Sequence, residues 1–324
     1  MNRKLLVLLI LAVVAVVLYR MAGVDFDWSL FVSSIWAVQP GIFVISMLMT
    51  FATYVCRAFR WQVLLNPLKR LRIGPLFSAT MLGFTGIFIL GRAGEFIRPL
   101  WITRREQIPL TASLATIIVE RFFDVLMLIV LFGASLLLVQ VPASASGAIA
   151  LMKDAAWFMV ASSVAAIIAL FFFRSNVDRI VRYIPFAGIG SLLKSFSEGL
   201  SFLQSGSSLF LVIVHSVAVW TTIVLQFWFM LIGMNFNFPL EVATLVMVGA
   251  AIGSVAQIPG IGGGFQAGYV FCMTTFFGVP AEQAIATSLL AWVSSNIPTV
   301  AASSIYMISQ GLSLKDLRAA TAAQ

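Results

Sequence analysis

Residues 91–99 read GRAGEFIRP and follow a run, 75–90, that is almost wholly apolar. The charges of two arginines and a glutamate cost free energy in a segment built for lipid, and two glycines accompany them. Backbone that leaves the helix at membrane depth is tolerated only inside protein or beside a water-filled cavity. This stretch therefore predicts the tip of a broken membrane segment, where a polar ligand would meet charged side chains.

The composition predicts an all-α polytopic membrane protein. Of its 324 residues, 61% are hydrophobic and only 10% are charged, which is unusual for a soluble globular domain. A helix needs about 20 apolar residues to span a bilayer. The apolar runs fall near 5–19, 41–59, 75–90, 110–139, 155–173, 208–234, 240–258, 265–277 and 284–308. The net charge of +8 is distributed among short loops, so it indicates topology rather than nucleic-acid binding.

The positions of the basic residues predict which segments cross the membrane. Basic loops face the cytoplasm, and the basic clusters are Arg3/Lys4, Arg57/Arg60/Lys69/Arg70/Arg72, Arg104/Arg105, Arg174/Arg179/Arg182/Lys194 and Lys315/Arg318. All five clusters lie on the cytoplasmic side only if residues 75–103 enter the membrane and leave it on the same face, as a re-entrant hairpin. The same argument makes 240–277 a second hairpin. We therefore expect six spanning helices, cytoplasmic termini and insertion in the cytoplasmic (inner) membrane.

The chain is expected to form a single transmembrane domain, 1–324, built on an inverted repeat. Sliding the halves so that Gly262 falls on Gly91 also places Gln266 on Glu95 and Pro280 on Pro109. Paired short segments interrupted by Gly and Pro indicate a transporter's binding site. The expected divisions are a first helix and external loop (1–40), repeat one (41–140), a connecting helix with a cytoplasmic interfacial amphipathic segment (141–207), repeat two (208–310) and a cytoplasmic tail (311–324).

Two groups of charges are candidates for a substrate site. Arg92, Glu95 and Arg98 are three apart and share one face if helical, and arginine forks suit phosphate. Glu120, Arg121 and Asp124 lie about 16 Å into the next helix. The competing interpretation is a neutral structural network that locks the hairpin to 110–139. We assign substrate binding to Arg92, Glu95, Arg98, Glu120, Arg121 and Gln266, and structural or coupling roles to Asp124, Gly91, Gly94, Pro259, Gly260, Gly262 and Gly263.

The order of four motifs gives a resemblance. GRAGEFIRP, VERFFDVL, IPGIGGGFQAGY and GVPAEQAIATSLL follow one another, and the chain resembles the lysylphosphatidylglycerol synthase transmembrane-region family, also described as flippase-like membrane proteins. The resemblance implies movement of a lipid between leaflets. The family often has a glutamate where this chain has Gln266 and an arginine near Trp292, so a symmetric two-carboxylate mechanism is not expected here.

We expect a lipid flippase or transporter that is not an enzyme and needs no cofactor or metal. Its expected partners are membrane lipids: an anionic or aminoacylated phospholipid, a polyprenyl phosphate or a hopanoid-type lipid. A homo-oligomer is left open. One alternative is a proton-coupled secondary transporter of a small solute, which inverted halves equally allow. The other is an integral-membrane lipid transferase, for which the sequence offers only His215, the cysteines Cys56 and Cys272 within apolar runs, and the Asp25/Asp27 pair.

Overall fold

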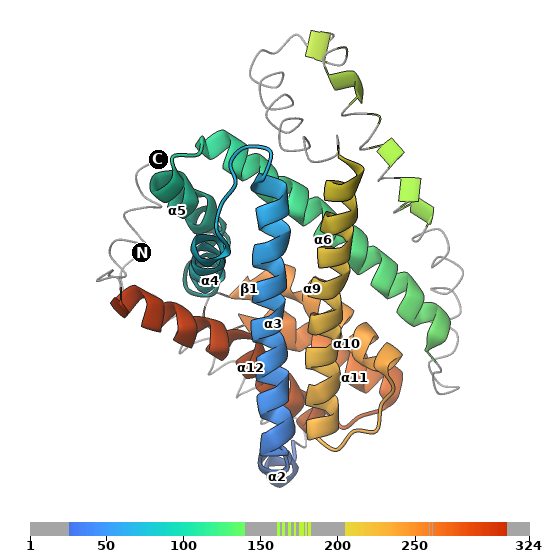
Figure 1. The fold of residues 1–324 in the computed structure, drawn as a ribbon. Helices are drawn as coiled ribbons and strands as arrows, with labels where there is room; N and C mark the ends of the chain where they lie inside the picture. The colour runs from blue at the N-terminus through green and yellow to red at the C-terminus, as the bar shows by residue number, and fades with distance from the viewer. Residues whose placement is uncertain are drawn as a thin grey trace.

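The computed structural model describes residues 26–139, scattered positions between 161 and 182, and 205–309 apart from 259 and 261. The predicted first helix near 5–19, most of 155–173 and most of the amphipathic segment lie outside the described residues. Figure 1 shows the arrangement. The elements are α2 (Trp28–Trp36), α3 (Pro40–Leu65), α4 (Ile73–Leu90), η1 (Gly91–Phe96), α5 (Ile97–Glu106), α6 (Leu110–Leu138), α9 (Gly206–Gly233), α10 (Leu240–Gly253), η4 (Ser254–Ala256), β1 (Gln257–Ile258), β2 (Gly262–Gly263), α11 (Gly264–Phe277) and α12 (Ala281–Ser309).

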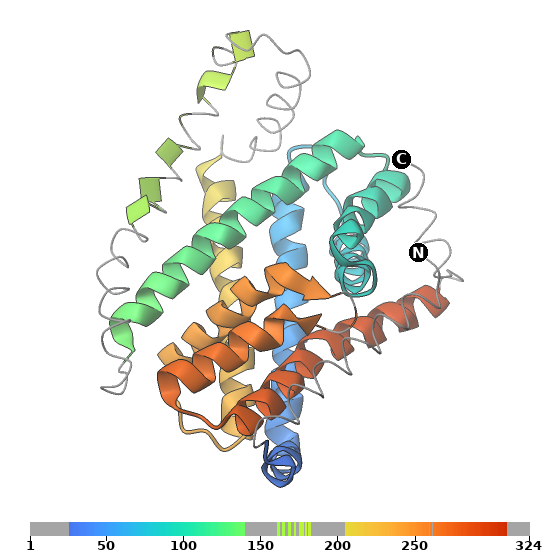
Figure 2. The same cartoon turned by 180° about the vertical axis from the view of Figure 1, so that it is seen from behind.

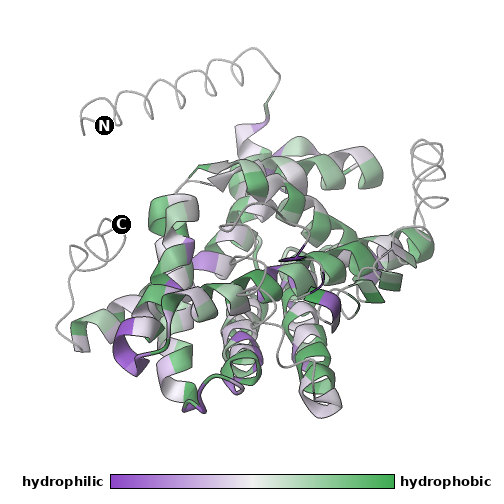
Figure 3. Cartoon of the chain, turned by 90° about the horizontal axis from the view of Figure 1, so that it is seen from above, coloured by the Kyte–Doolittle hydropathy of each residue, from purple (hydrophilic) through white to green (hydrophobic). Residues whose placement is uncertain are grey.

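The helices are long and apolar, as the composition predicts. Five described helices, α3, α4, α6, α9 and α12, are long and apolar enough to cross a membrane. Figure 3 shows that hydrophobic residues dominate their ribbons. Large apolar side chains such as Leu48, Phe59 and Phe210 are exposed on their outer faces, which suits contact with lipid tails. The chain is therefore a multi-pass membrane protein, while the count of six spans stays a prediction.

Helices α3 and α9 form the central pair and run antiparallel (Figure 1). The Ser46 hydroxyl donates to the Gln226 carbonyl at 3.0 Å. Farther along, the Arg60 guanidinium donates to the Ser216 hydroxyl at 3.2 Å. Residue numbers increase along α3 in the direction in which they decrease along α9. The first long helix of each half therefore points in the opposite direction to the other.

The first hairpin consists of α4, η1 and α5, whose arms pack closely because of small residues. A Cβ on Gly94 would overlap the backbone of Gly86 and Ile87. A Cβ on Gly83 would lie 2.8 Å from the Cβ of Arg98. Glycines at these positions let the two backbones approach each other, as small residues do between membrane helices.

The second hairpin, from α10 to α11, uses the same device with a different tip. A Cβ on Gly264 would overlap the carbonyl of Gly253, and one on Gly268 would overlap that of Gly249. At the tip, the short strands β1 and β2 pair antiparallel. Figure 2 shows these strands facing α4. The hairpins touch there, because the Gly260 N–H donates to the Phe88 carbonyl at 2.8 Å.

One expectation about the basic residues is wrong. Arg57 and Arg60 were assigned to a cytoplasmic loop, but both lie inside α3, with 7% and 0% of their surface exposed. Helix α3 continues to Leu65, beyond the apolar run expected to end near residue 59. The two arginines are held within the protein because carboxylates of another helix pair with them.

Candidate functional site

Two carboxylates on α6 hold the centre of a buried charge cluster. Glu120 and Asp124 are four residues apart and therefore share one face of the helix. Arg57 and Arg60 of α3 point at the same face. Arg60 lies 2.8 Å from Asp124 Oδ1 and 3.4 Å from Glu120 Oε1. Arg57 lies 3.1 Å from Asp124 Oδ2 and 3.6 Å from Glu120 Oε1.

Arg98 connects the first hairpin to this cluster. Its Nη1 donates to Glu120 Oε1 at 2.8 Å, and its guanidinium stacks 3.9 Å from the ring centroid of Trp61. Trp61 is itself fixed, because its indole N–H donates to the Thr116 hydroxyl at 3.0 Å. A charge-assisted hydrogen bond and a cation–π contact thus join α5 to both α3 and α6.

Arg121 completes the cluster at its edge. Its guanidinium lies 3.6 Å from Asp124 Oδ2, and 38% of its side chain is exposed. Arg57 and Arg121 also lie over the ring of Phe84, at 5.0 Å and 5.7 Å from the centroid. The aromatic face offers both cations a partner that carries no formal charge.

The cluster contains more positive than negative charge. Among the described residues, four arginines (Arg57, Arg60, Arg98 and Arg121) share two carboxylates. In the same part of the chain, Nε and Nη2 of Arg98 have no hydrogen-bond partner. Buried charge without a full set of partners costs free energy. The charge balance therefore differs from that of the expected neutral network, which omitted Arg57 and Arg60. The expected link between the first hairpin and residues 110–139 is present in the contact of Arg98 with Glu120.

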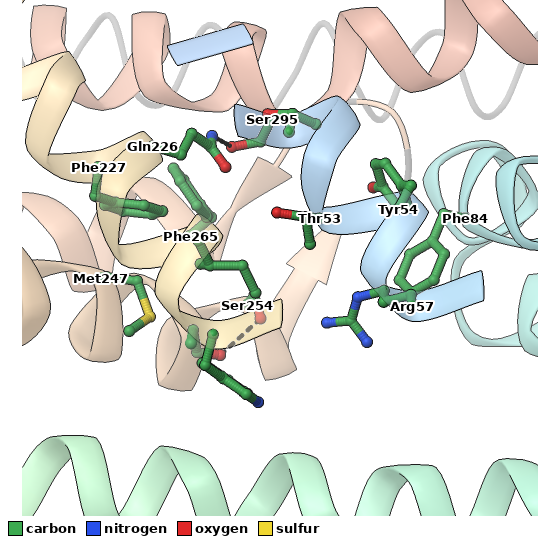
Figure 4. A pocket seen from close by; sticks show the side chains of 14 residues that line it. Thr53, Tyr54, Arg57, Phe84, Gln226, Phe227, Met247, Ser254, Phe265 and Ser295 are labelled. Atoms are coloured by element: carbon green, nitrogen blue, oxygen red, sulfur yellow. Dashed lines mark hydrogen bonds between the residues drawn. The ribbon is translucent and has the colours of Figure 1, made fainter. Parts of the chain in front are cut away.

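A cavity of about 240 Å³ lies beside the cluster, between the two halves. Figure 4 shows Arg57 and Phe84 at one end, and Phe227 and Met247 at the other. Its wall includes α3, α4, α9 and α12 as well as Ser254 and Phe265 at the tip of the second hairpin. Both hairpins thus border one central space.

A second, much smaller space is also lined by Phe84. It has a volume of about 10 Å³, near the minimum for one water, and Glu95, Arg98 and Arg121 are among its lining residues. Glu95 is exposed. Phe84 lines both spaces, so the larger cavity and the one bordered by Glu95 share a wall residue.

The tip of the second hairpin is held by backbone geometry that only glycine adopts readily. Gly260, Gly262 and Gly263 have φ of 75°, 96° and 92°, which favours glycine. The Gly263 N–H donates to Gln266 Oε1 at 2.6 Å, so the Gln266 side chain caps α11. Pro259 lies outside the described residues.

The sequence candidates are distributed unevenly over this geometry. Arg98, Glu120, Arg121 and Asp124 meet in one cluster. Glu95 lies at its edge, whereas Gln266 lies at the other hairpin's tip. Gly91 ends α4 with φ 65°, and Arg92 belongs to η1. Arg57 and Arg60 were missed; their spacing of three within VCRAFRWQ, on an otherwise apolar helix, was the available signal.

Comparison with known proteins identifies the family. The model of the lysylphosphatidylglycerol synthase transmembrane region matches residues 5–303. The chain belongs to this family. The match spans both hairpins and every residue of the charge cluster, so the site lies within the part of the chain that the family shares. Membership of the lysylphosphatidylglycerol synthase transmembrane-region family makes the chain a membrane protein of a lipid-related family. Neither a curated protein nor a solved structure matches the chain.

Proposed function

We propose that the protein moves a lipid between the leaflets of the cytoplasmic membrane, without catalysing a covalent reaction. The observation that carries the proposal is the cavity of about 240 Å³ between the hairpins, with Arg57 at its end. Small-molecule pockets usually measure about 300–1,000 Å³. The cavity therefore suits a headgroup but not a whole lipid.

The mechanism separates the two parts of the lipid. The headgroup enters the cavity, where Arg57 and hydroxyl groups replace its water, while the acyl chains stay in the bilayer against the exposed apolar faces. Only the headgroup then needs help to cross, because hydrocarbon is already compatible with lipid. Partners would be phospholipids, aminoacylated lipids, or polyprenyl- or hopanoid-type lipids.

The proposal includes the finer architecture. The two hairpins would be re-entrant from opposite sides, six helices would span, and both termini would be cytoplasmic. Support comes from the antiparallel α3 and α9 and from the contact between Gly260 and Phe88. Opposed half-spanning segments that meet near the midplane are typical of inverted-repeat transporters.

The test is leaflet exchange in proteoliposomes. The full chain is reconstituted with phospholipids labelled on the acyl chain, and dithionite is added to quench label in the outer leaflet. In empty liposomes we expect dithionite to quench only the label in the outer leaflet. In proteoliposomes we expect the label of the inner leaflet to be quenched as well, because the protein carries it to the outer leaflet. No acceleration for any headgroup would overturn the proposal.

A pair of variants ties the exchange to the cavity. Ala251→Phe places a ring in the cavity wall and should slow exchange at least tenfold. Ala301→Phe makes the same change at an exposed position of α12 and should leave the rate unchanged. Equal rates in folded samples of both variants would show that lipid passes elsewhere.

A further inference from the structure

The larger cavity presents only one kind of formal charge. Among the described residues that line it, Arg57 alone is charged, and no carboxylate faces the space. The pairing of Arg57 is incomplete, because its closest partner, Asp124 at 3.1 Å, is shared with Arg60 and Arg121. A headgroup in this cavity therefore meets positive potential.

The cluster behind Arg57 adds to this potential. Its four arginines exceed Glu120 and Asp124 by two charges, and they still exceed the carboxylates by one when Glu95 is counted. Charges separated by protein rather than water interact strongly. An anion next to Arg57 would complete the pairing that the carboxylates leave unfinished.

The neutral groups of the cavity also favour an anion. Trp220 lines the cavity, and within the described part of the chain its buried indole N–H has no hydrogen-bond partner. Trp220 is 7% exposed, so this donor has little access to bulk water. Indole nitrogen donates and cannot accept, and an arginine fork matches the geometry of phosphate oxygens.

We propose that the cavity selects lipids whose headgroup is a net anionic phosphate over lipids in which an ammonium group offsets the phosphate. The selectivity in transport rests on the proposed function, whereas the selectivity in binding does not, because binding is measured separately. A lysyl, choline or ethanolamine cation would lie near Arg57 without a carboxylate to receive it. Like charges in such a setting discriminate between ligands by repulsion.

The binding test uses the full chain in detergent and short-chain lipids with identical acyl chains. We expect dihexanoyl phosphatidic acid and dihexanoyl phosphatidylglycerol to raise Tm more than dihexanoyl phosphatidylcholine or the lysyl derivative of the glycerol lipid does, because ligands that bind only the folded state stabilise it. Equal shifts for all four lipids, or a larger shift for the lysyl derivative, would overturn the proposal.

Inorganic phosphate, added at the same concentrations, separates a lipid headgroup from a free anion. The lipid assignment predicts a much smaller shift with inorganic phosphate than with dihexanoyl phosphatidic acid, because acyl chains add contacts. Equal shifts would assign the site to a soluble anion and overturn the lipid class.

Two tryptophans give a matched pair of variants. Trp220→Phe removes the unpartnered donor of a residue in the cavity wall and should weaken the apparent affinity for dihexanoyl phosphatidic acid about tenfold, the loss expected for one hydrogen bond to a charged group. Trp292→Phe removes an equally unpartnered indole N–H that does not line the cavity and should change nothing. Unchanged affinity in folded Trp220→Phe would contradict the proposal.

Arg57→Gln tests the charge itself and should abolish the preference for anionic lipids, whereas Arg104→Gln at an exposed position of α5 should retain it. If Arg57→Gln does not fold, the result for Trp220→Phe decides between the outcomes.

Leaflet exchange is then measured for the same lipids. Exchange without headgroup preference overturns this inference, while selective binding without exchange of any lipid overturns the proposed function and supports the selectivity.

Discussion

The two hairpins share a construction and differ in chemistry. Both join their arms through glycine contacts, Gly86 with Gly94 in the first and Gly253 with Gly264 in the second. The first carries Arg98 into the buried cluster. Between residues 240 and 277, the second carries only one charge, in the first turn of α10. One hairpin thus supplies charge, and the other supplies a shaped wall.

This difference indicates how two hairpins of similar construction can serve a ligand that is not symmetric. The anionic phosphate headgroup proposed above has one charged group and needs one charged end of a cavity, with neutral surface around the rest. Phe265 and Ser254 of the second half complete the wall opposite Arg57. A change in the first half should therefore alter charge balance, and a change in the second should alter shape.

The largest effect is expected from Glu120→Gln. Glu120 is fully buried, and its Oε1 lies within 3.6 Å of Arg57, Arg60 and Arg98. Removing its charge leaves four arginines with one remaining carboxylate, Asp124, and leaves Arg98 without a carboxylate partner. Breaking a buried ion pair costs about 3–5 kcal/mol, comparable with the whole stability of many domains. We expect little monodisperse protein by size-exclusion chromatography.

The control for Glu120→Gln is Glu106→Gln. Glu106 pairs with Lys69 at 3.3 Å near the surface, where such a pair contributes about 1 kcal/mol or less. Its yield should match that of the unchanged protein. A normal yield of Glu120→Gln would show that the cluster does not hold the first hairpin in place.

A smaller loss is expected from Gly264→Ala in the second hairpin. The new methyl group would overlap the Gly253 carbonyl, and overpacking of this kind costs about 1–3 kcal/mol. The arms would separate and shift Phe265 in the cavity wall. We expect a lower Tm together with weaker lipid binding, whereas Gly74→Ala, with no atom within 4 Å of the added Cβ, should retain both. A lower Tm with unchanged lipid binding would show that the packing of the second hairpin does not determine the shape of the lipid site.

Part of this architecture is visible in the sequence. Charged and glycine-rich interruptions of apolar runs locate both hairpin tips, and the spacing of Glu120 and Asp124 places them on one face. Arg57 and Arg60 could not be placed in the same way. A basic residue near the end of an apolar run suits a cytoplasmic loop equally well, and only the carboxylates of α6, more than sixty residues away in the chain, decide that these arginines lie inside. The contact of Gly260 with Phe88 depends on tertiary packing in the same way.

The smallest effect on stability is expected from Glu95→Gln, which tests how the first hairpin balances its charge. Glu95 is exposed and borders the small cavity with Arg98 and Arg121, so its substitution should change the free energy of unfolding by about 0.5 kcal/mol or less. Without its charge, the excess of the cluster grows by one. An anionic headgroup should then bind about two- to fivefold more tightly, as expected for a screened charge interaction, and leave more slowly.

Leaflet exchange in Glu95→Gln should therefore slow while binding tightens, because binding a headgroup more strongly at rest does not help it to move on. The shift in Tm with dihexanoyl phosphatidic acid and the dithionite rate measure the two quantities on one preparation. The control is Glu106→Gln at the end of α5, the helix that follows η1. Weaker binding would instead show that Glu95 receives a cation, and would favour the aminoacylated lipids that Arg57 is expected to repel. Loss of folded protein would assign Glu95 to the structure of the hairpin, and the charge balance of the site would then rest on the charged residues of α3, α5 and α6.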